Sequence, residues 1–292
     1  MKIAVSGRVP DAASASGIHR LLSILHEEGA ELCCHEPLCV ALSSFGRAFV
    51  PDGTFDTTSA IPADTAMILA LGGDGTFLSA LEMAWSRDIP VAGINFGRLG
   101  FLTAAGMGED ARAWAADLVS GRCSIQERSV LKVDYAGLPD GFFPMALNEF
   151  VIRRDGPQML SIDVSVDGRP LPTYWADGIM VVTPTGSTAY SLSLGGPVVM
   201  PDSHVILITP LASHNLNVRP LVIPQSAEVE VVIHTRDGHG LLMADNRSVT
   251  IPAGEKLVFM CAASPLRCVT FDDNFINALK TKLFWGEDRR NH

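Results

Sequence analysis

The hydrophobic periodicity of the chain changes once, near residue 125, and this change constrains the fold more than any other feature. Before it, apolar runs such as AMILAL (66–71) alternate with segments of helical spacing such as SGIHRLLSILHEEGA (16–30). A wholly apolar run is typical of a strand in a parallel sheet that is covered on both faces. The strand–helix order of residues 1–125 therefore predicts an α/β N-terminal domain with an open parallel sheet.

After residue 125 the apolar side chains alternate with polar ones, as in LSIDVSVD (160–167). Several similar runs follow, separated by Pro, Gly and Asn, and this pattern is typical of short strands. Residues 126–271 are therefore predicted to form a β-rich, sandwich-like C-terminal domain with its own core. Residues 272–292 return to helical spacing, and we expect this helix to pack back on the first domain or on a neighbouring subunit.

The net charge of −10 limits the partners of the chain. Such an acidic surface repels nucleic acid and anionic membranes, because phosphate groups are bound by clustered Lys and Arg. No apolar stretch reaches the roughly 18 residues of a membrane span, and the N-terminus lacks a signal-peptide core, so we expect a cytoplasmic protein. The six cysteines are irregularly spaced and are expected to be free thiols rather than a metal site. A phosphate ligand would have to be neutralised locally.

The segment Gly72-Gly73-Asp74-Gly75-Thr76 lies between the apolar run 66–71 and a helix-like run over 77–85. Ligands of α/β sheets bind at such a junction, where glycine amides and a helix N-terminus favour an anion. The segment lacks the Lys of a P-loop and the G-x-G-x-x-G spacing. Since a carboxylate repels phosphate, Asp74 is expected to act on a hydroxyl or to hold magnesium. The alternative is a tight turn in which Asp74 caps the helix.

A second segment, TPTGSTAYSLS (183–193), is unusually rich in hydroxyl groups. It follows the strand-like run GIMVV (178–182), so that its hydroxyls and exposed amides would lie at a strand end. Such groups suit a sugar, a base edge or a phosphate. A polar turn with local side-chain hydrogen bonds is the alternative.

A polar pair, Asn148 and Glu149, interrupts the apolar run ALNEFVIRR (146–154). Burying such a pair without partners is costly. The pair either lies at a strand end facing a ligand, or Glu149 pairs with Arg153 or Arg154. Asp177, just before a strand, has the same ambiguity, whereas His214 lies in a polar loop and is interpreted as a loop-shaping residue.

Together these segments resemble the NAD kinase family. The resemblance is carried by GGDGT (72–76), GINFGRLGFL (93–102), LNE (147–149), DG (177–178), TPTGSTAYSLS (183–193) and RPLV (219–222), in this order. It implies an α/β domain followed by a β-rich domain. It also implies phosphoryl transfer from ATP, with Mg²⁺, to the 2′-hydroxyl of the adenosine ribose of NAD, giving NADP. Family members are usually homo-oligomers, so a dimer or a tetramer is expected.

The resemblance also implies roles for single residues. Asp74 matches the proton acceptor of the family, Gly75 lies beside it, and Asn148 and Glu149 match the pair that holds the dinucleotide. Asp177 matches a further ligand-contacting acid. The nucleotide-contacting positions of the family correspond here to Thr185, Thr188, Ala189, Tyr190, Ser191, Ser193 and Ala212.

The chain departs from the family pattern at three places. ASHNLN (212–217) differs from the commoner loop, and Asp245-Asn246-Arg247 stands where Asp-Gly-Gln is frequent. Trp175 replaces a basic or small residue, which leaves the donor open between ATP and polyphosphate.

Two other functions remain as alternatives. A diacylglycerol-kinase-like lipid kinase shares the glycine–aspartate turn, but it needs an apolar or basic surface, which the net charge of −10 disfavours. A non-catalytic dinucleotide-binding regulator would have no need for Asp74 together with Asn148, Glu149 and Asp177.

Overall fold

The computed structural model of the chain describes residues 1–96, 100–103, 111–270 and 274–286. The chain divides into two compact units. Unit 1 comprises Met1–Glu127 and Leu266–His292, and unit 2 comprises Arg128–Pro265. No helix within the described ranges is long and apolar enough to cross a membrane. No disulfide joins the six cysteines, all of which lie within these ranges.

Unit 1 alternates strands and helices, as the hydrophobic pattern predicts. Its elements are β1 (Lys2–Gly7), α1 (Ala12–Glu27), β2 (Glu31–His35), α2 (Glu36–Ser44), β3 (Gly53–Phe55), the 3₁₀ turn η1 (Thr58–Ala60), β4 (Met67–Leu71), α3 (Asp74–Trp85), β5 (Val91–Ile94), α4 (Ala111–Val119), β6 (Ser124–Arg128), β20 (Leu266–Thr270) and α6 (Asn274–Leu283).

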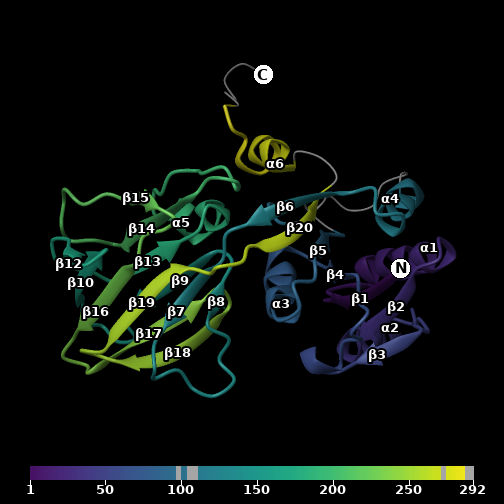
Figure 1. Cartoon of the computed structure of the whole chain (residues 1–292), viewed down its shortest axis with the longest axis horizontal. Helices are drawn as coiled ribbons and strands as arrows, with labels where there is room; N and C mark the ends of the chain where they lie inside the picture. The colour runs from purple at the N-terminus through teal and green to yellow at the C-terminus, as the bar shows by residue number, and fades with distance from the viewer. Residues whose placement is uncertain (97–99, 104–110, 271–273, 287–292) are drawn as a thin grey trace. The chain divides into compact units, whose positions relative to one another are not determined.

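The strands of unit 1 form one sheet in the order β3-β2-β1-β4-β5-β20-β6 (Figure 1). The pairs β1–β2, β2–β3, β1–β4, β4–β5 and β5–β20 are parallel. From β1 the chain proceeds to β2 and β3 on one side, and then returns to β4 and β5 on the other. The strand order therefore reverses between β1 and β4, which is where open α/β sheets bind their ligands. The predicted open parallel sheet is confirmed.

The core of unit 1 forms where α1 covers the sheet. Ile3 and Val5 of β1 and Leu69 of β4 are fully buried, and they belong to the same apolar cluster as Leu21 and Leu25 of α1. Each fully buried aliphatic side chain stabilises the fold by about 1.5–3 kcal/mol relative to exposure. This burial holds the carboxyl ends of β1 and β4 in place.

Unit 2 consists mainly of short strands. Its elements are β7 (Leu131–Asp134), β8 (Met145–Ala146), β9 (Glu149–Arg153), β10 (Leu160–Val166), β11 (Arg169–Pro170), β12 (Tyr174–Ala176), β13 (Gly178–Val182), the 3₁₀ turn η2 (Thr185–Thr188), α5 (Tyr190–Ser193), β14 (Val205–Leu211), β15 (Leu221–Pro224), β16 (Val229–His234), β17 (His239–Ala244), β18 (Arg247–Pro252) and β19 (Lys256–Cys261).

The strands of unit 2 form two sheets that pack face to face. One sheet has the order β15-β14-β13-β9-β17-β18, and the other has β11-β10-β16-β19-β7-β8 with β12 beside β10. Phe150 of the first sheet and Phe259 of the second meet with ring centroids 5.2 Å apart in one buried cluster. The strand pairs that the structure describes in both sheets are antiparallel, for example β9–β13 and β10–β16. The predicted β-rich, sandwich-like architecture is confirmed.

The central strand β13 is buried along its whole length, Gly178–Val182. One face lies in the sandwich core. On the other face, Met180 and Val182 form a second apolar cluster against which Leu194 and Val199 pack. The segment that follows β13 therefore folds back over its own strand, and this places the hydroxyl-rich turn 183–193 at the end of the sheet.

Strand β20 belongs to the sheet of unit 1, whereas the sequence-based division placed residues up to 271 in the second domain. Its residues Leu266–Thr270 alternate like those of unit 2, yet Cys268 pairs with Val91 of β5 in the sheet of unit 1. Strand periodicity identifies a strand but not the sheet that it joins. The C-terminal segment 266–292 is counted with unit 1 by its contacts. Phe275 of α6 lies 5.8 Å, between ring centroids, from Phe101 of that unit.

Candidate functional site

The glycine–aspartate segment follows β4 directly, at the carboxyl end of the strand where the sheet order reverses. Gly72 has φ +148°, a conformation that favours glycine. A Cβ atom there would lie 2.4 Å from Oγ1 of Thr76. The chain can then enter α3 immediately, so this helix begins at Asp74 rather than at the predicted residue 77. A Cβ atom added at Gly75 would meet no heavy atom within 4 Å among the described residues, so a ligand can approach this backbone closely.

The carboxylate of Asp74 is bound by the segment 101–103. Oδ2 accepts the backbone N–H of Phe101 at 3.1 Å, and Oδ1 accepts the N–H of Leu102 at 3.2 Å and the hydroxyl of Thr103 at 3.3 Å. These contacts differ from the alternative in which Asp74 caps its own helix. They orient the carboxylate before any substrate is bound. Because a carboxylate offers about four lone-pair positions, it retains capacity for a further donor.

Helix α6 places a cation beside the same carboxylate. Nζ of Lys282 lies 3.5 Å from Oδ2 of Asp74 and 5.0 Å from the ring centroid of Phe101. The sequence pattern predicted that this helix packs on the first domain or on a neighbouring subunit, but it did not indicate a contact with Asp74. In a chain of net charge −10, this ammonium group supplies positive charge where phosphate would need it.

In unit 2, the LNE segment and the hydroxyl-rich turn are in direct contact. The carbonyl oxygen of Asn148 accepts the N–H of Thr183 at 2.9 Å, and the hydroxyl of Thr183 donates to the carbonyl of Leu147 at 2.5 Å. The N–H of Gly186 donates to that hydroxyl oxygen at 3.1 Å. Two segments that the sequence singled out independently thus form one local structure.

Glu149 is a buried acid, and among the described residues no ion pair joins it to a cation. Its exposed fraction is 8%, and Oε2 has no hydrogen-bond partner among the described residues. Burial, followed by the negative charge of Asp245, raises the pKa of Glu149 to about 8. Arg154 does not pair with Glu149, because its guanidinium forms two contacts with Asp177 at 2.8 and 3.1 Å. At neutral pH Glu149 is therefore protonated and can donate a hydrogen bond.

The titration of Glu149 predicts a pH-dependent stability. Between pH 4.5 and about 8 the folded chain holds a proton that the unfolded chain has released. Stability therefore falls as pH rises through this window, by up to about 1.4 kcal/mol per pH unit. Glu149→Gln removes this contribution. Urea unfolding at pH 5–8.5 is expected to show the variant gaining stability relative to the wild type as pH rises.

Glu228→Gln is the matched control, because Glu228 is exposed. Its stability difference from the wild type is expected to stay constant over the same pH range. A constant difference for Glu149→Gln as well would contradict a protonated Glu149.

A pocket of about 330 Å³ in unit 2 brings three predicted residues together. Asp177, Tyr190 and Ala212 line it, together with Arg153 and Arg154. Ala212 follows β14 with φ +45°, an uncommon conformation for a residue other than glycine. The pocket thus combines two carboxylates, two guanidinium groups and an aromatic ring, which suits a polar ligand with a planar base.

The other predicted turn residues divide into buried and exposed positions. Thr185 is buried and accepts a hydrogen bond from Nη1 of Arg128 at 3.3 Å, and the hydroxyl of Thr188 donates to the carbonyl of Thr185 at 3.3 Å. Ser191 is fully buried and its hydroxyl meets that of Thr209 at 3.1 Å. Ala189 is half-buried and Ser193 is exposed. Thr185 and Ser191 therefore shape the turn through contacts within unit 2.

Trp175 is hydrogen-bonded to the loop that contains His214. The side-chain oxygen of Asn215 accepts the N–H of Trp175 at 2.8 Å, and the N–H of His214 donates to the carbonyl of Trp175 at 2.7 Å. The contact of His214 is made by its backbone, in agreement with a loop-shaping residue. Within the part of the chain that the structure describes, no group of three or more His, Cys, Asp or Glu residues could hold a metal ion.

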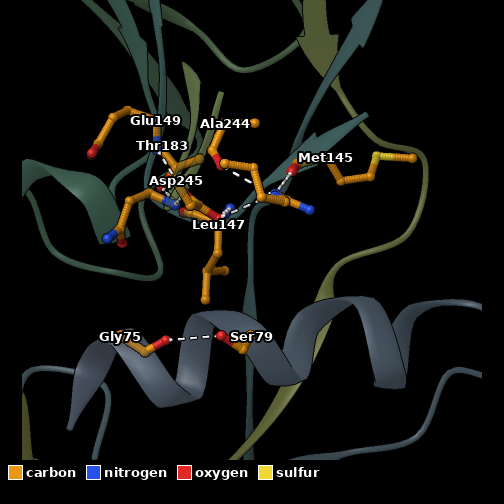
Figure 2. A network of polar contacts seen from close by, with 10 residues as sticks. Gly75, Ser79, Met145, Leu147, Glu149, Thr183, Ala244 and Asp245 are labelled. Atoms are coloured by element: carbon orange, nitrogen blue, oxygen red, sulfur yellow. Dashed lines mark hydrogen bonds and ion pairs between the residues drawn. The ribbon is translucent and has the colours of Figure 1, made fainter. Parts of the chain in front are cut away.

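Sequence reasoning missed two features of the site. Lys282 carried no signal, because a Lys near a helix C-terminus is common. Asp245 was noted only as part of a departure from the family pattern, because it lies in a two-residue turn between alternating strands and Asp-Asn is an ordinary turn sequence. Its carboxylate is nevertheless buried and contacts the LNE segment, as Figure 2 shows.

Comparison with known proteins gives matches over nearly the whole chain. The model of the ATP-NAD kinase N-terminal domain matches residues 25–123, and that of the ATP-NAD kinase C-terminal domain matches residues 147–271. An NAD kinase of Bacteroides fragilis is 38% identical over 295 aligned positions, covering 99% of this chain and 100% of that protein. An NAD kinase of Christiangramia forsetii is 35% identical and covers 100% of both chains.

Two solved structures share the fold. Yeast NADH kinase in complex with NADH has a TM-score of 0.88 at 23% identity, covering 100% of this chain and 90% of that one. An NAD kinase from Archaeoglobus fulgidus in complex with ATP has a TM-score of 0.74 at 23% identity, covering 95% and 96%.

Proposed function

Since this chain belongs to the NAD kinase family, as both family models and full-length relatives show, we propose that it phosphorylates NAD. The reaction transfers the γ-phosphoryl group of ATP to the 2′-hydroxyl of the adenosine ribose, giving NADP and ADP. The observation that carries this assignment is the pre-oriented carboxylate of Asp74, held by Phe101, Leu102 and Thr103 beyond the carboxyl end of β4.

In the proposed mechanism, Asp74 accepts a hydrogen bond from the 2′-hydroxyl. A bond forms between the ribose oxygen and the γ-phosphorus while the bond from that phosphorus to the β,γ-bridging oxygen breaks, and ADP leaves with the electron pair. The hydroxyl proton passes to Asp74 late in this loose transition state. Because a carboxylate is a weak base, orientation of the hydroxyl contributes more than proton affinity.

Unit 2 supplies groups for binding the dinucleotide. We assign Asn148 and Glu149 to this role, with the protonated Glu149 as a hydrogen-bond donor. The pocket with Asp177, Tyr190 and Ala212 offers polar contacts and an aromatic face. Thr185, Thr188, Ala189, Ser191 and Ser193 form or flank the turn beside it.

The donor is proposed to be ATP with Mg²⁺, because the ion neutralises the charge that develops on the transferred phosphoryl group. We also propose a homo-oligomer, a dimer or a tetramer. The edge strand β15 supports this, since it exposes the apolar side chains of Leu221 and Val222.

A single assay tests the proposed function. Purified protein is incubated with NAD, ATP and Mg²⁺, and NADP is measured with a dehydrogenase that uses only NADP. Formation of NADP that depends on ATP is the expected result. If NAD binds by calorimetry but no NADP forms with ATP or with polyphosphate, the chain is a dinucleotide-binding regulator instead. Replacing ATP by polyphosphate, and NAD by NADH, gives the range of donors and acceptors.

A further inference from the structure

Asp245 is a turn residue whose charged side chain is buried rather than exposed to solvent. It lies in the two-residue turn between β17 and β18, with φ +51°. Its side chain is only 1% exposed. Strand β17 pairs with β9, so that this turn lies beside the start of β9 at Glu149. The Asp245 carboxylate is therefore directed into the protein at the LNE segment (Figure 2).

The carboxylate accepts three consecutive backbone N–H groups. Oδ2 accepts the N–H of Leu147 at 2.9 Å, and Oδ1 accepts those of Asn148 at 2.8 Å and Glu149 at 3.3 Å. In return, the N–H of Asp245 donates to the carbonyl of Glu149 at 3.1 Å. Buried backbone donors need acceptors, and hydrogen bonds to an ionised acceptor are roughly twice as strong as neutral ones. One side chain thus holds the backbone of all three LNE residues.

Arg247 follows the turn directly and contacts the residues that precede the LNE segment. Its Nη2 donates to the carbonyl of Met145 at 2.5 Å and its Nε to that of Ala244 at 3.3 Å. Its guanidinium lies 5.1 Å from the ring centroid of Phe143, and Nη2 lies 4.0 Å from Oδ2 of Asp245. Residues of a single hairpin turn therefore hold the chain from Phe143 to Glu149.

We propose that Asp245 is a positioning residue for the dinucleotide, which fixes the backbone of residues 147–149 so that Asn148 and Glu149 are ordered before NAD binds. This inference rests on the proposed function, because it assumes that Asn148 and Glu149 contact NAD. Asp245 itself does not contact the substrate; it acts through the backbone of its neighbours.

The distribution of charge between the two buried acids agrees with this role. Both oxygens of Asp245 accept N–H groups, and Arg247 lies nearby, whereas Oε2 of Glu149 has no partner among the described residues. Burial raises the pKa of Asp245, while the three N–H donors and Arg247 oppose the rise. The geometry favours the charge on Asp245 and the proton on Glu149.

Asp245→Asn tests the proposal in the full-length chain. Asn tolerates positive φ as Asp does, so the change mainly replaces an acceptor oxygen by an amide that faces a backbone N–H. We expect the Kd for NAD, measured by calorimetry, and the KM for NAD to rise about 10- to 100-fold. We expect kcat at saturating NAD to change less than about threefold, because Asp74 and its partners are unaltered.

Asp167→Asn is the matched control. Asp167 also lies in a hairpin turn with positive φ, +50°, and it accepts the N–H of Glu228 at 2.9 Å, but it is exposed. Its NAD affinity is expected to equal that of the wild type. Wild-type affinity in Asp245→Asn overturns the proposal, and so does a loss of kcat without a rise in KM. Asp245→Ser, which keeps one acceptor oxygen, replaces the Asn variant if that chain does not fold.

Amide hydrogen exchange in the wild type gives an independent test. If Asp245 orders the segment, the amides of residues 147–149 are protected before NAD is added, and they exchange at least about 10-fold faster in the variant. Protection that develops only when NAD is added would show that the ligand orders the segment, which overturns the proposal. Failure of the proposed function is a separate result, because it appears as absent NADP formation in the wild type.

Discussion

Asp74→Asn is expected to lower kcat for NADP formation about 10²- to 10⁴-fold, the usual contribution of a positioned proton acceptor. The amide cannot take the proton of the 2′-hydroxyl. Its NH₂ group also cannot accept the backbone N–H, of Phe101 or of Leu102, that the replaced carboxylate oxygen bound. NAD should still bind, since the assigned binding residues Asn148 and Glu149 belong to unit 2. Steady-state kinetics with the NADP-specific dehydrogenase gives kcat, and calorimetry gives the Kd for NAD.

Thr103→Val is the control for this variant. It removes the hydroxyl that donates to Oδ1 of Asp74 at 3.3 Å but keeps the carboxylate. We expect kcat to fall less than about tenfold, because one neutral hydrogen bond contributes about 0.5–1.5 kcal/mol. Near-normal turnover in Asp74→Asn would remove Asp74 from the mechanism. An equal loss in both variants would indicate that the segment 101–103, rather than the carboxylate, is required.

Gly186→Ala is expected to cause the largest loss of stability, together with a loss of NAD binding. A Cβ atom at Gly186 would lie 2.2 Å from the carbonyl oxygen of Asn148, 2.6 Å from its carbonyl carbon and 2.9 Å from its Cα. All three are backbone atoms, so the turn and the LNE segment must separate. Overpacking of this kind costs about 1–3 kcal/mol or more in the free energy of unfolding. Urea unfolding and calorimetry with NAD measure the two effects.

Gly53→Ala is the matched control, because among the described residues a Cβ atom there meets only Sγ of Cys33, at 3.5 Å. Its free energy of unfolding is expected to lie within about 0.5 kcal/mol of the wild type. Unchanged stability and NAD affinity in Gly186→Ala would contradict the close contact between the two segments.

The sequence was sufficient for the architecture, and it supplied the candidate residues whose roles are proposed above. The apolar run at 66–71 and the alternation at 160–167 predicted the parallel sheet of unit 1 and the strands of unit 2. The order of the motifs identified the family. These predictions succeed because backbone periodicity and glycine conformation are local properties, readable within a few residues.

The partners of the site residues were not predictable in this way. Asp245 contacts Asn148 across 97 positions of the sequence, and Arg154 pairs with Asp177, 23 positions away, rather than with Glu149. Strand β20 joins a sheet whose nearest other members precede it by more than a hundred residues.

The sequence by itself thus determined the change from an α/β domain to a β-rich one, the family, and that Asp74 lies at a strand end. The tertiary structure decided the membership of β20, the cation that α6 brings to Asp74, and the proton that Glu149 holds at neutral pH. The reason is that hydrophobic patterns report which side chains are buried. The pKa of a carboxyl group and the conformation of a backbone segment depend instead on which distant groups are buried with them.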